Sequence, residues 1–163
     1  KSTLANKIVE KIDCNILPTD EFFLDRELRY GEGRNLTACN IKSYHLASLK
    51  AVIHSLENGL DCYYKPRKKE EFILLKGNKI TIIEGIAAAF LKKEDALIIY
   101  LTQNKKTELS KKLERDLKKG KTKEFITENV KTMREEFERG IEPLINNCDM
   151  KINVDSILNS EII

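Results

Sequence analysis

The sequence lacks any long apolar run and any charged-then-apolar leader. A membrane-spanning helix needs about 18 or more consecutive apolar residues, so we expect no segment to cross a membrane. A leader would have directed the chain out of the cytosol. These absences predict a cytoplasmic protein without a membrane partner.

Closely spaced cysteines are also absent. The four cysteines are scattered along the chain, at Cys14, Cys39, Cys62 and Cys148. Without a CxxC pair or a short Cys/His spacing, a zinc site is not expected, and a chain of 163 residues does not need a disulfide framework. Reduced thiols in a cytosol fit this pattern.

The chain has little excess charge of either sign. Its 29 Lys and Arg residues against 26 Asp and Glu residues give a net charge of +3. This excess is too small to predict nucleic-acid binding by itself. There are no internal repeats, and 163 residues with 41% hydrophobic content suit the core of one domain over residues 1–163.

Helical and strand periods alternate along the chain, which is typical of an α/β fold with a parallel sheet covered by helices on both faces. Apolar runs predict strands, and spaced apolar residues predict helices. The predicted strands are residues 14–18, 79–85, 96–102 and 150–154. The predicted helices begin near residues 1 and 44 and run over residues 107–119 and about 123–146. Residues 79–85, apolar on both faces, are placed at the sheet centre. Residues 26–37 are predicted to be a loop.

The chain opens on Lys1-Ser2-Thr3, followed by an amphipathic helix. One interpretation is a plain helix cap, because Ser and Thr are common at helix starts. The other is the second half of the phosphate-binding pattern GxxxxGK[ST], in which lysine reaches the phosphates and the hydroxyl holds magnesium. On this second interpretation we expect a strand and the glycine half of the loop to precede Lys1, missing from these 163 residues.

Two carboxylates follow predicted strands, and they favour the second interpretation. Asp20 comes after the strand over residues 14–18, and Glu84 closes the strand over residues 79–85. Catalytic carboxylates often lie at the carboxyl ends of parallel strands. Asp20 could take a proton from a substrate hydroxyl, or cap a helix; Glu84 could serve a magnesium ion, or pair structurally.

The motifs together resemble the uridine kinase and phosphoribulokinase-like family of P-loop kinases, over nearly the whole chain. The similar segments are "PTDEFF", "IIEGI", "KKLERDLKKGK" and "IEPLINNCDMKINV". The resemblance implies a three-layer P-loop NTPase fold with a helical lid at about residues 105–123. It also implies an ATP- and Mg²⁺-dependent kinase that phosphorylates a hydroxyl of a small metabolite.

The resemblance assigns roles to individual residues. Lys1, Asp20 and Arg115 are the expected catalytic residues, and Ser2 and Glu84 the expected metal ligands. The expected nucleotide-binding residues are Lys1, Ser2, Thr3, Lys112, Arg115, Lys119 and Lys121. Phe23, Tyr63 and Tyr64 are candidates for an acceptor pocket, although aromatic residues beside buried strands usually belong to the core. Lys112, Arg115 and Lys119 are expected to form one positive helix face.

Three departures from the family pattern bear on the acceptor. The family's His-Pro step is absent, no histidine lies near Tyr63 or Tyr64, and several lid arginines are lysines, which cannot make a bidentate fork. We expect a nucleoside such as uridine as the acceptor. The alternatives are nicotinamide riboside, pantothenate, glycerate or a sugar phosphate, or a nucleotide-binding domain without transfer.

A third class of function is binding of a polyanion by the lysine-rich residues 105–123. This segment lacks interleaved aromatic residues, so nucleic acid is not the expected partner. A homo-oligomer is compatible with the sequence, which does not decide the oligomeric state.

Overall fold

A computed structural model describes residues 1–67, 69–91 and 96–155. The chain forms two compact units, Lys1–Lys92 and Lys93–Ile163, and each is described by itself. Both units mix helices with parallel strands, as the sequence predicts. The assignment of residues 1–163 to one domain stays a prediction.

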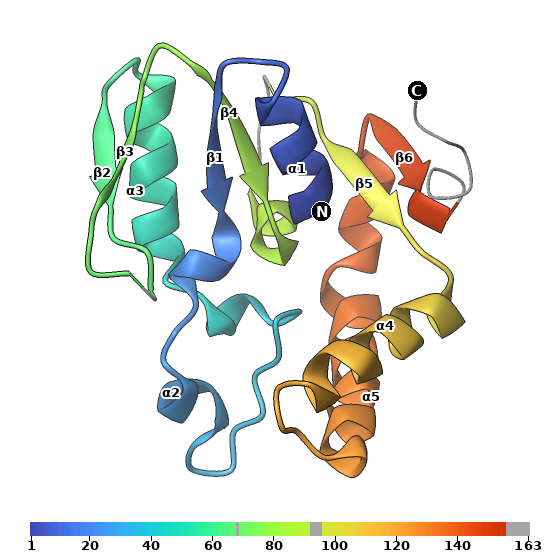
Figure 1. Ribbon diagram of the computed structural model, residues 1–163. Coiled ribbons are helices and arrows are strands. Elements are labelled where there is room, and N and C mark those ends of the chain that lie inside the picture. The colour runs from blue at the N-terminus through green and yellow to red at the C-terminus, as the bar shows by residue number, and fades with distance from the viewer. Residues whose placement is uncertain (68, 92–95, 156–163) are drawn as a thin grey trace. The chain divides into compact units, whose positions relative to one another are not determined.

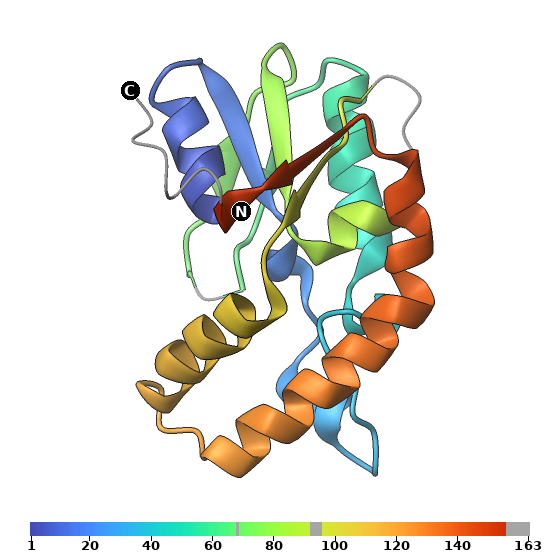
Figure 2. The same cartoon turned by 90° about the vertical axis from the view of Figure 1, so that its right-hand side faces the viewer.

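The first unit contains most of the secondary structure elements (Figure 1). In chain order they are α1 (Ser2–Val9), β1 (Cys14–Pro18), η1 (Thr19–Phe22), α2 (Arg26–Tyr30), η2 (Ile41–Ser43), α3 (Leu46–Glu57), β2 (Cys62–Tyr64), β3 (Ile73–Leu75), β4 (Ile80–Glu84) and η3 (Ile86–Phe90). Figure 2 shows α1 and α3 on opposite sides of the β1–β4 pair. The core of the unit is built around Leu17, Leu49 and Ile53.

Strands β1 and β4 pair in parallel, from Cys14 opposite Ile80 to Pro18 opposite Glu84. Their bounds agree with the strands predicted at residues 14–18 and 79–85. The predicted central position of β4 was wrong for the described residues, in which β4 pairs only with β1. Ile80 is 68% exposed because no described element covers this end of the strand.

A buried asparagine ties β1 to the chain that leads into β4. Asn15 donates from Nδ2 to the carbonyl oxygen of Lys76 at 2.8 Å and to Thr81 Oγ1 at 2.9 Å. Its Oδ1 accepts from the backbone N–H of Lys76 at 3.1 Å. The side chain therefore has partners for both its donor and its acceptor group, as burial of an amide requires.

Two parts of the first unit differ from the sequence prediction. Residues 26–37, predicted as a loop, begin with the short helix α2. The helix has no apolar stripe from which it could be predicted. After the helix, the backbone N–H of Leu36 donates to the Arg29 carbonyl at 2.9 Å, which brings the two ends of the segment together. Strands β2 and β3 form an antiparallel hairpin of three residue pairs, which is too short to give a clear period of two.

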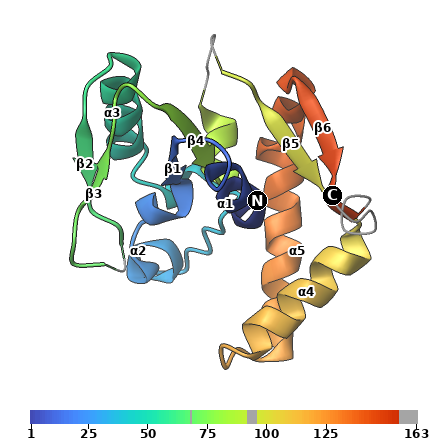
Figure 3. The same ribbon diagram turned by 45° about the horizontal axis from the view of Figure 1, so that its top comes forward.

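The second unit contains β5 (Ile99–Thr102), α4 (Lys105–Leu117), α5 (Lys123–Gly140), η4 (Glu142–Asn147) and β6 (Met150–Asn153). Strands β5 and β6 are parallel neighbours, and α4 and α5 form a helical hairpin (Figure 3). The predicted helix over residues 123–146 ends at Gly140, because Pro143 cannot continue an α-helix and η4 takes over. None of the described helices combines the length and the hydrophobicity needed to cross a membrane.

Candidate functional site

The first site residues meet across the sheet edge in the first unit. Ser2 Oγ donates a hydrogen bond to Glu84 Oε1 at 2.9 Å, although 82 positions separate the two residues. Ser2 lies in the first turn of α1, and Glu84 is the last residue of β4. Lys1, not Ser2, occupies the N-cap position, and its side chain makes no capping hydrogen bond. The plain-cap interpretation of Ser2 is therefore wrong.

The start of α1 offers backbone donors beside these side chains. The first intrahelical bond runs from the N–H of Ala5 to the carbonyl of Lys1 at 3.0 Å. The N–H groups of Ser2, Thr3 and Leu4 consequently have no acceptor within the helix. Lys1 and Thr3 are exposed. Free N–H groups and the positive end of the helix dipole together favour an anion such as a phosphate.

Asp20 lies at the same edge of the sheet as Glu84. The β1–β4 register places Pro18 opposite Glu84, and Asp20 follows Pro18 by two residues in η1. Its side chain is exposed. Because Pro18 holds the N-cap position of η1, the helix-cap interpretation of Asp20 does not apply. One edge thus carries a hydroxyl and two carboxylates: Ser2, Glu84 and Asp20.

Close packing between Thr19 and Gly85 holds the two strand ends together. Gly85 has a φ of +134°, a conformation that residues with a Cβ rarely adopt. A Cβ atom at Gly85 would lie 1.9 Å from Thr19 Oγ1. Thr19 is fully buried, and its hydroxyl has no hydrogen-bond partner in the described part of the chain. The glycine in "IIEGI" is thus a steric requirement of the site.

Aromatic rings form a wall next to Asp20. Phe23, whose N–H donates to the Asp20 carbonyl at 3.3 Å, stacks on Tyr44 with ring centroids 4.4 Å apart. Tyr44 donates its hydroxyl hydrogen to the Ala38 carbonyl at 2.7 Å. Burial raises the pKa of Tyr44 well above its usual value, and the nearby charge of Asp20 raises it further. Phe23 is therefore a wall residue beside the predicted base.

The two other predicted pocket residues occupy different surroundings. Tyr64 is 6% exposed and stacks on Phe22 at a centroid distance of 5.8 Å, within the core. Tyr63 is 65% exposed on the hairpin, in register with Leu74. Successive residues of a strand point to opposite faces, so β2 cannot present both rings to one pocket.

The donor set at the sheet edge suits a magnesium ion. Mg²⁺ prefers oxygen ligands, keeps several waters and commonly takes only one or two protein groups together with substrate phosphates. Ser2 Oγ and Glu84 Oε1 are two such oxygens at 2.9 Å from each other. Residues 1–67, 69–91 and 96–155 contain no cluster of three or more His, Cys, Asp or Glu that would form an all-protein metal cage.

The positive face predicted for α4 differs in part from the structure. Lys112 is half-buried, and its Nζ donates to Asn129 Oδ1 of α5 at 3.3 Å. Burial lowers the pKa of Lys112. Arg115 and Lys119 remain exposed and line one shallow hollow on α4, together with Lys111, Glu114 and Lys118. Lys112 therefore joins the two helices, because its long side chain reaches α5.

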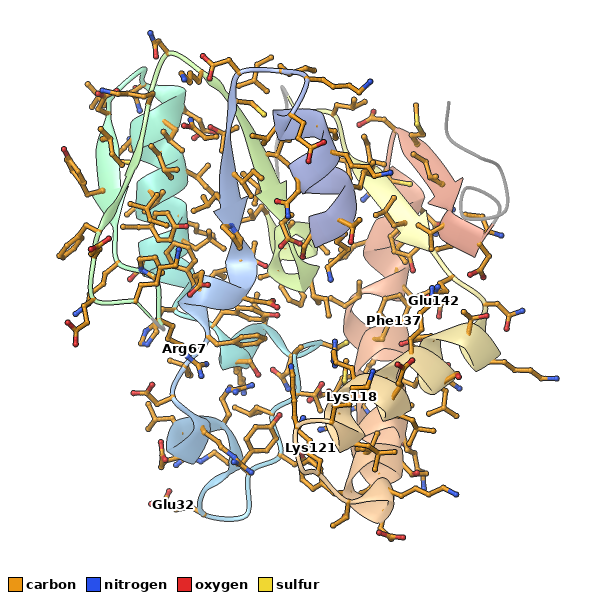
Figure 4. All side chains as sticks on the ribbon, in the orientation of Figure 1. Glu32, Arg67, Lys118, Lys121, Phe137 and Glu142 are labelled. Carbon is orange, nitrogen blue, oxygen red and sulfur yellow. The ribbon has the colours of Figure 1, made fainter. Side chains whose placement is uncertain are left out.

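Asp116, for which the sequence predicted no role, holds two of the basic residues of this unit in place. Its side chain is 4% exposed and accepts from Arg115 Nε at 2.8 Å and from Lys121 Nζ at 2.8 Å. Figure 4 shows Lys118 and Lys121 at the α4–α5 turn. Lys118 pairs with Glu114 at 2.7 Å on the exposed face, as the i, i+4 spacing predicts. The sequence "ERDLKKGK" places this acid among several basic residues, and this pattern could have indicated that Asp116 pairs with them.

Asp116 makes the stability of this unit pH-dependent. Burial raises the pKa of Asp116, but the bonds from Arg115 and Lys121 outweigh it and hold the pKa at about 2, below the usual 3.8. The charged carboxylate therefore contributes stability above about pH 4, and this contribution of about 2 kcal/mol is lost as the pH falls through 2. Denaturant unfolding of wild type and Asp116→Asn should differ by this amount near neutral pH and converge in acid. Glu114→Gln, on the exposed face, is the control; a constant difference at all pH values would contradict the assignment.

The family comparison covers almost the whole chain. The sequence model of the phosphoribulokinase / uridine kinase family matches residues 1–159. No curated protein matches the sequence significantly. The match includes Ser2, Asp20 and Glu84 in the first unit and the helical hairpin of the second.

Proposed function

The chain belongs to the phosphoribulokinase / uridine kinase family, whose members are ATP-dependent kinases, and we propose that it transfers a phosphoryl group from ATP to a hydroxyl of a small metabolite. The single observation that carries this proposal is the Ser2–Glu84 hydrogen bond of 2.9 Å at the edge that also bears Asp20. Phosphoryl transfer requires charge compensation and an oriented nucleophile at one place.

The start of α1 would hold the phosphates of the nucleotide. The backbone N–H groups of Ser2 and Thr3 and the side chain of Lys1 all belong to this end of the helix. Lys1 would stabilise the negative charge of the transferred group. The fold proposed with this role is the three-layer P-loop fold.

Ser2 and Glu84 would hold the magnesium ion of the nucleotide. When bound, Mg²⁺ neutralises charge on the phosphate oxygens. The hydrogen bond between Ser2 and Glu84 keeps both oxygens at one place before a nucleotide arrives. Glu84 in turn is positioned by β4 and by the packing of Gly85 on Thr19.

Asp20 would act as the general base. Its carboxylate can accept the proton of the acceptor hydroxyl as that oxygen attacks the γ-phosphorus of ATP. The Phe23 ring beside it stacks on Tyr44 and lies under the Arg29 guanidinium, so it would border the acceptor by its edge. A nucleoside such as uridine is the acceptor first suggested by the sequence; nicotinamide riboside, pantothenate, glycerate and sugar phosphates are the alternatives.

Residues 105–123 would form a lid over the nucleotide. Arg115 and Lys121 are pre-oriented by Asp116, and Arg115 shares its hollow with Lys119. Fixed cations of this kind stabilise charge that develops on a transferred phosphoryl group and exclude water. Lys112 would support the lid from the α4–α5 contact.

An ADP-release assay with Ser2→Ala tests the proposal. The assay supplies ATP, Mg²⁺ and a panel of nucleosides and small hydroxyl metabolites. We expect acceptor-dependent ADP from wild type, and from Ser2→Ala a rise of at least about tenfold in the Mg²⁺ concentration needed for half-maximal rate, because a metal oxygen ligand is lost. Asn6→Ala, exposed on the same helix and assigned no role in nucleotide binding, is the matched control.

Two outcomes would contradict the proposed kinase activity. Nucleotide binding without ADP release for any acceptor would indicate a nucleotide-binding domain without transferase activity. Retention of nucleic acid at low salt that depends on Lys119 and Lys121, with no nucleotide binding, would instead support the polyanion interpretation.

A further inference from the structure

Two arginine side chains in the first unit converge on one backbone oxygen. Arg29, in α2, donates from Nε to the Leu24 carbonyl at 3.1 Å. Arg67, which follows the β2 strand, donates from Nη1 to the same oxygen at 3.5 Å. The shared acceptor brings the two guanidinium groups close enough for one anion to reach both of them.

Contacts on each side hold these arginines in place. The Arg29 guanidinium lies over the Phe23 ring at 4.5 Å and beside the Tyr30 ring at 5.0 Å. The Arg67 backbone N–H donates to Glu21 Oε2 at 2.7 Å, which anchors the main chain at this residue. Figure 4 shows Arg67 over the chain that leads from η1 to α2, while Glu32 lies at the far tip of the following loop.

The charge of this pair is not balanced by a carboxylate. In residues 1–67, 69–91 and 96–155, neither Arg29 nor Arg67 forms an ion pair, whereas Arg34 pairs with Glu32 and Arg115 with Asp116. The acids nearest to Arg29 in the chain are Glu27 and Glu32, and those nearest to Arg67 are Glu70 and Glu71. Within the described residues none of them pairs with either arginine, and Glu21 bonds to a backbone N–H. One carbonyl oxygen does not neutralise two full positive charges, so an anion would relieve their repulsion.

The arginine pair is next to the predicted base. Phe23 links them: its N–H bonds to the Asp20 carbonyl, and its ring lies under Arg29. Tyr44, stacked on Phe23, feels the charges of both, because Asp20 raises its pKa and Arg29 lowers it, beside the larger effect of burial. A molecule at the edge of the Phe23 ring could therefore reach both Asp20 and the arginines.

We propose that Arg29 and Arg67 form an anion subsite for the acceptor, which carries a phosphate or carboxylate in addition to the hydroxyl that faces Asp20. This inference rests on the proposed kinase function and narrows its acceptor class. It moves the expected acceptor from a neutral nucleoside to an anionic hydroxyl metabolite. Arginine suits this role because its planar fork binds both oxyanions in bidentate geometry.

Matched pairs of acceptors test the subsite by kinetics. Ribose 5-phosphate is compared with ribose, glycerate with glycerol, and uridine serves as the neutral nucleoside. We expect the anionic member of a pair to have a KM at least about tenfold lower, and Arg67→Gln and Arg29→Gln each to remove that advantage with a smaller change in kcat. Preference for ribose 5-phosphate assigns a phosphate, and preference for glycerate alone a carboxylate. Arg34→Gln is the control, because Arg34 is already paired with Glu32.

A binding measurement separates the subsite from the kinase activity. Titration of inorganic phosphate is followed by the NMR signals of the arginine Nε–H groups, assigned by their loss in Arg29→Gln and Arg67→Gln. We expect the Arg29 and Arg67 signals to shift and the Arg34 signal to stay. Unfolding curves of each variant report whether it remains folded, and Arg29→Lys keeps the charge over Phe23 if Arg29→Gln does not fold.

The two proposals fail in distinguishable ways. Shifts of the Arg29 and Arg67 signals without ADP from any acceptor would support the anion subsite and reject the kinase. The opposite result is ADP release with uridine or another neutral acceptor that Arg67→Gln does not reduce, together with arginine signals that phosphate does not shift. This result would overturn the anion subsite and would still support the proposed kinase activity.

Discussion

Asp20→Asn is expected to lower kcat by about 10²–10⁴-fold, the range for loss of a positioned general base. Asparagine keeps the shape and the polar contacts of the side chain but cannot accept the hydroxyl proton. Asp20 is exposed at the sheet edge, outside the core, so the substitution should leave the fold intact. ATP affinity should therefore change little.

The measurement is acceptor-dependent ADP release at saturating ATP, together with ATP binding by the same variant. Asp25→Asn is a suitable control, because Asp25 is exposed five residues farther along, just before α2. An unchanged kcat in Asp20→Asn would remove Asp20 as the base. A large loss of ATP affinity would place it instead with the nucleotide.

Gly85→Ala is expected to destabilise the first unit by about 3 kcal/mol. A φ of +134° costs a residue with a Cβ about 1–3 kcal/mol, and the added atom would also meet Thr19 Oγ1 at 1.9 Å. Relief of this clash must move either Thr19, which is fully buried, or the end of β4. Either movement displaces Glu84 from Asp20, so activity should fall as well.

Gly59→Ala is the matched control for this prediction. Gly59 also has a positive φ, of +70°, but a Cβ there would meet no atom within 4 Å. Denaturant unfolding should show a loss of only about 1 kcal/mol for Gly59→Ala, from backbone strain alone. Equal losses for the two variants would show that contact with Thr19 contributes nothing.

Secondary structure followed from the sequence where apolar residues were regularly spaced. The β-branched run that ends at Glu84 predicted β4 within one residue of its observed bounds. The end of α5 was misplaced because the pattern of apolar residues continues past Gly140, although Pro143 stops the helix. Helix α2 could not be found this way, since its five residues carry no apolar stripe; Arg29 within it bonds to Leu24 and Leu36 instead.

The candidate site was predictable where a residue type suited to phosphate or metal chemistry stood at the start of a predicted helix or the end of a predicted strand. Ser2 and Glu84 were both expected at a metal, and they lie in hydrogen-bond contact. The anion subsite proposed for Arg29 and Arg67 was not predictable, because it depends on two segments that meet at the Leu24 carbonyl. Charge pattern also gave no account of Lys112, whose burial depends on where α5 packs.

The buried Asn15 lies at the opposite end of the β1–β4 pair from the site, yet it fixes the alignment of the two strands. Its three hydrogen bonds to Lys76 and Thr81 are satisfied only in the observed pairing. A slip of one residue in the pairing would leave the buried Asn15 amide without its hydrogen-bond partners. It would also turn every side chain of β1 to the opposite face of the sheet. The slip would also move Pro18 out of register with Glu84. The Asn15 amide, at the far end of the strand, therefore helps to set the distance between Asp20 and Glu84.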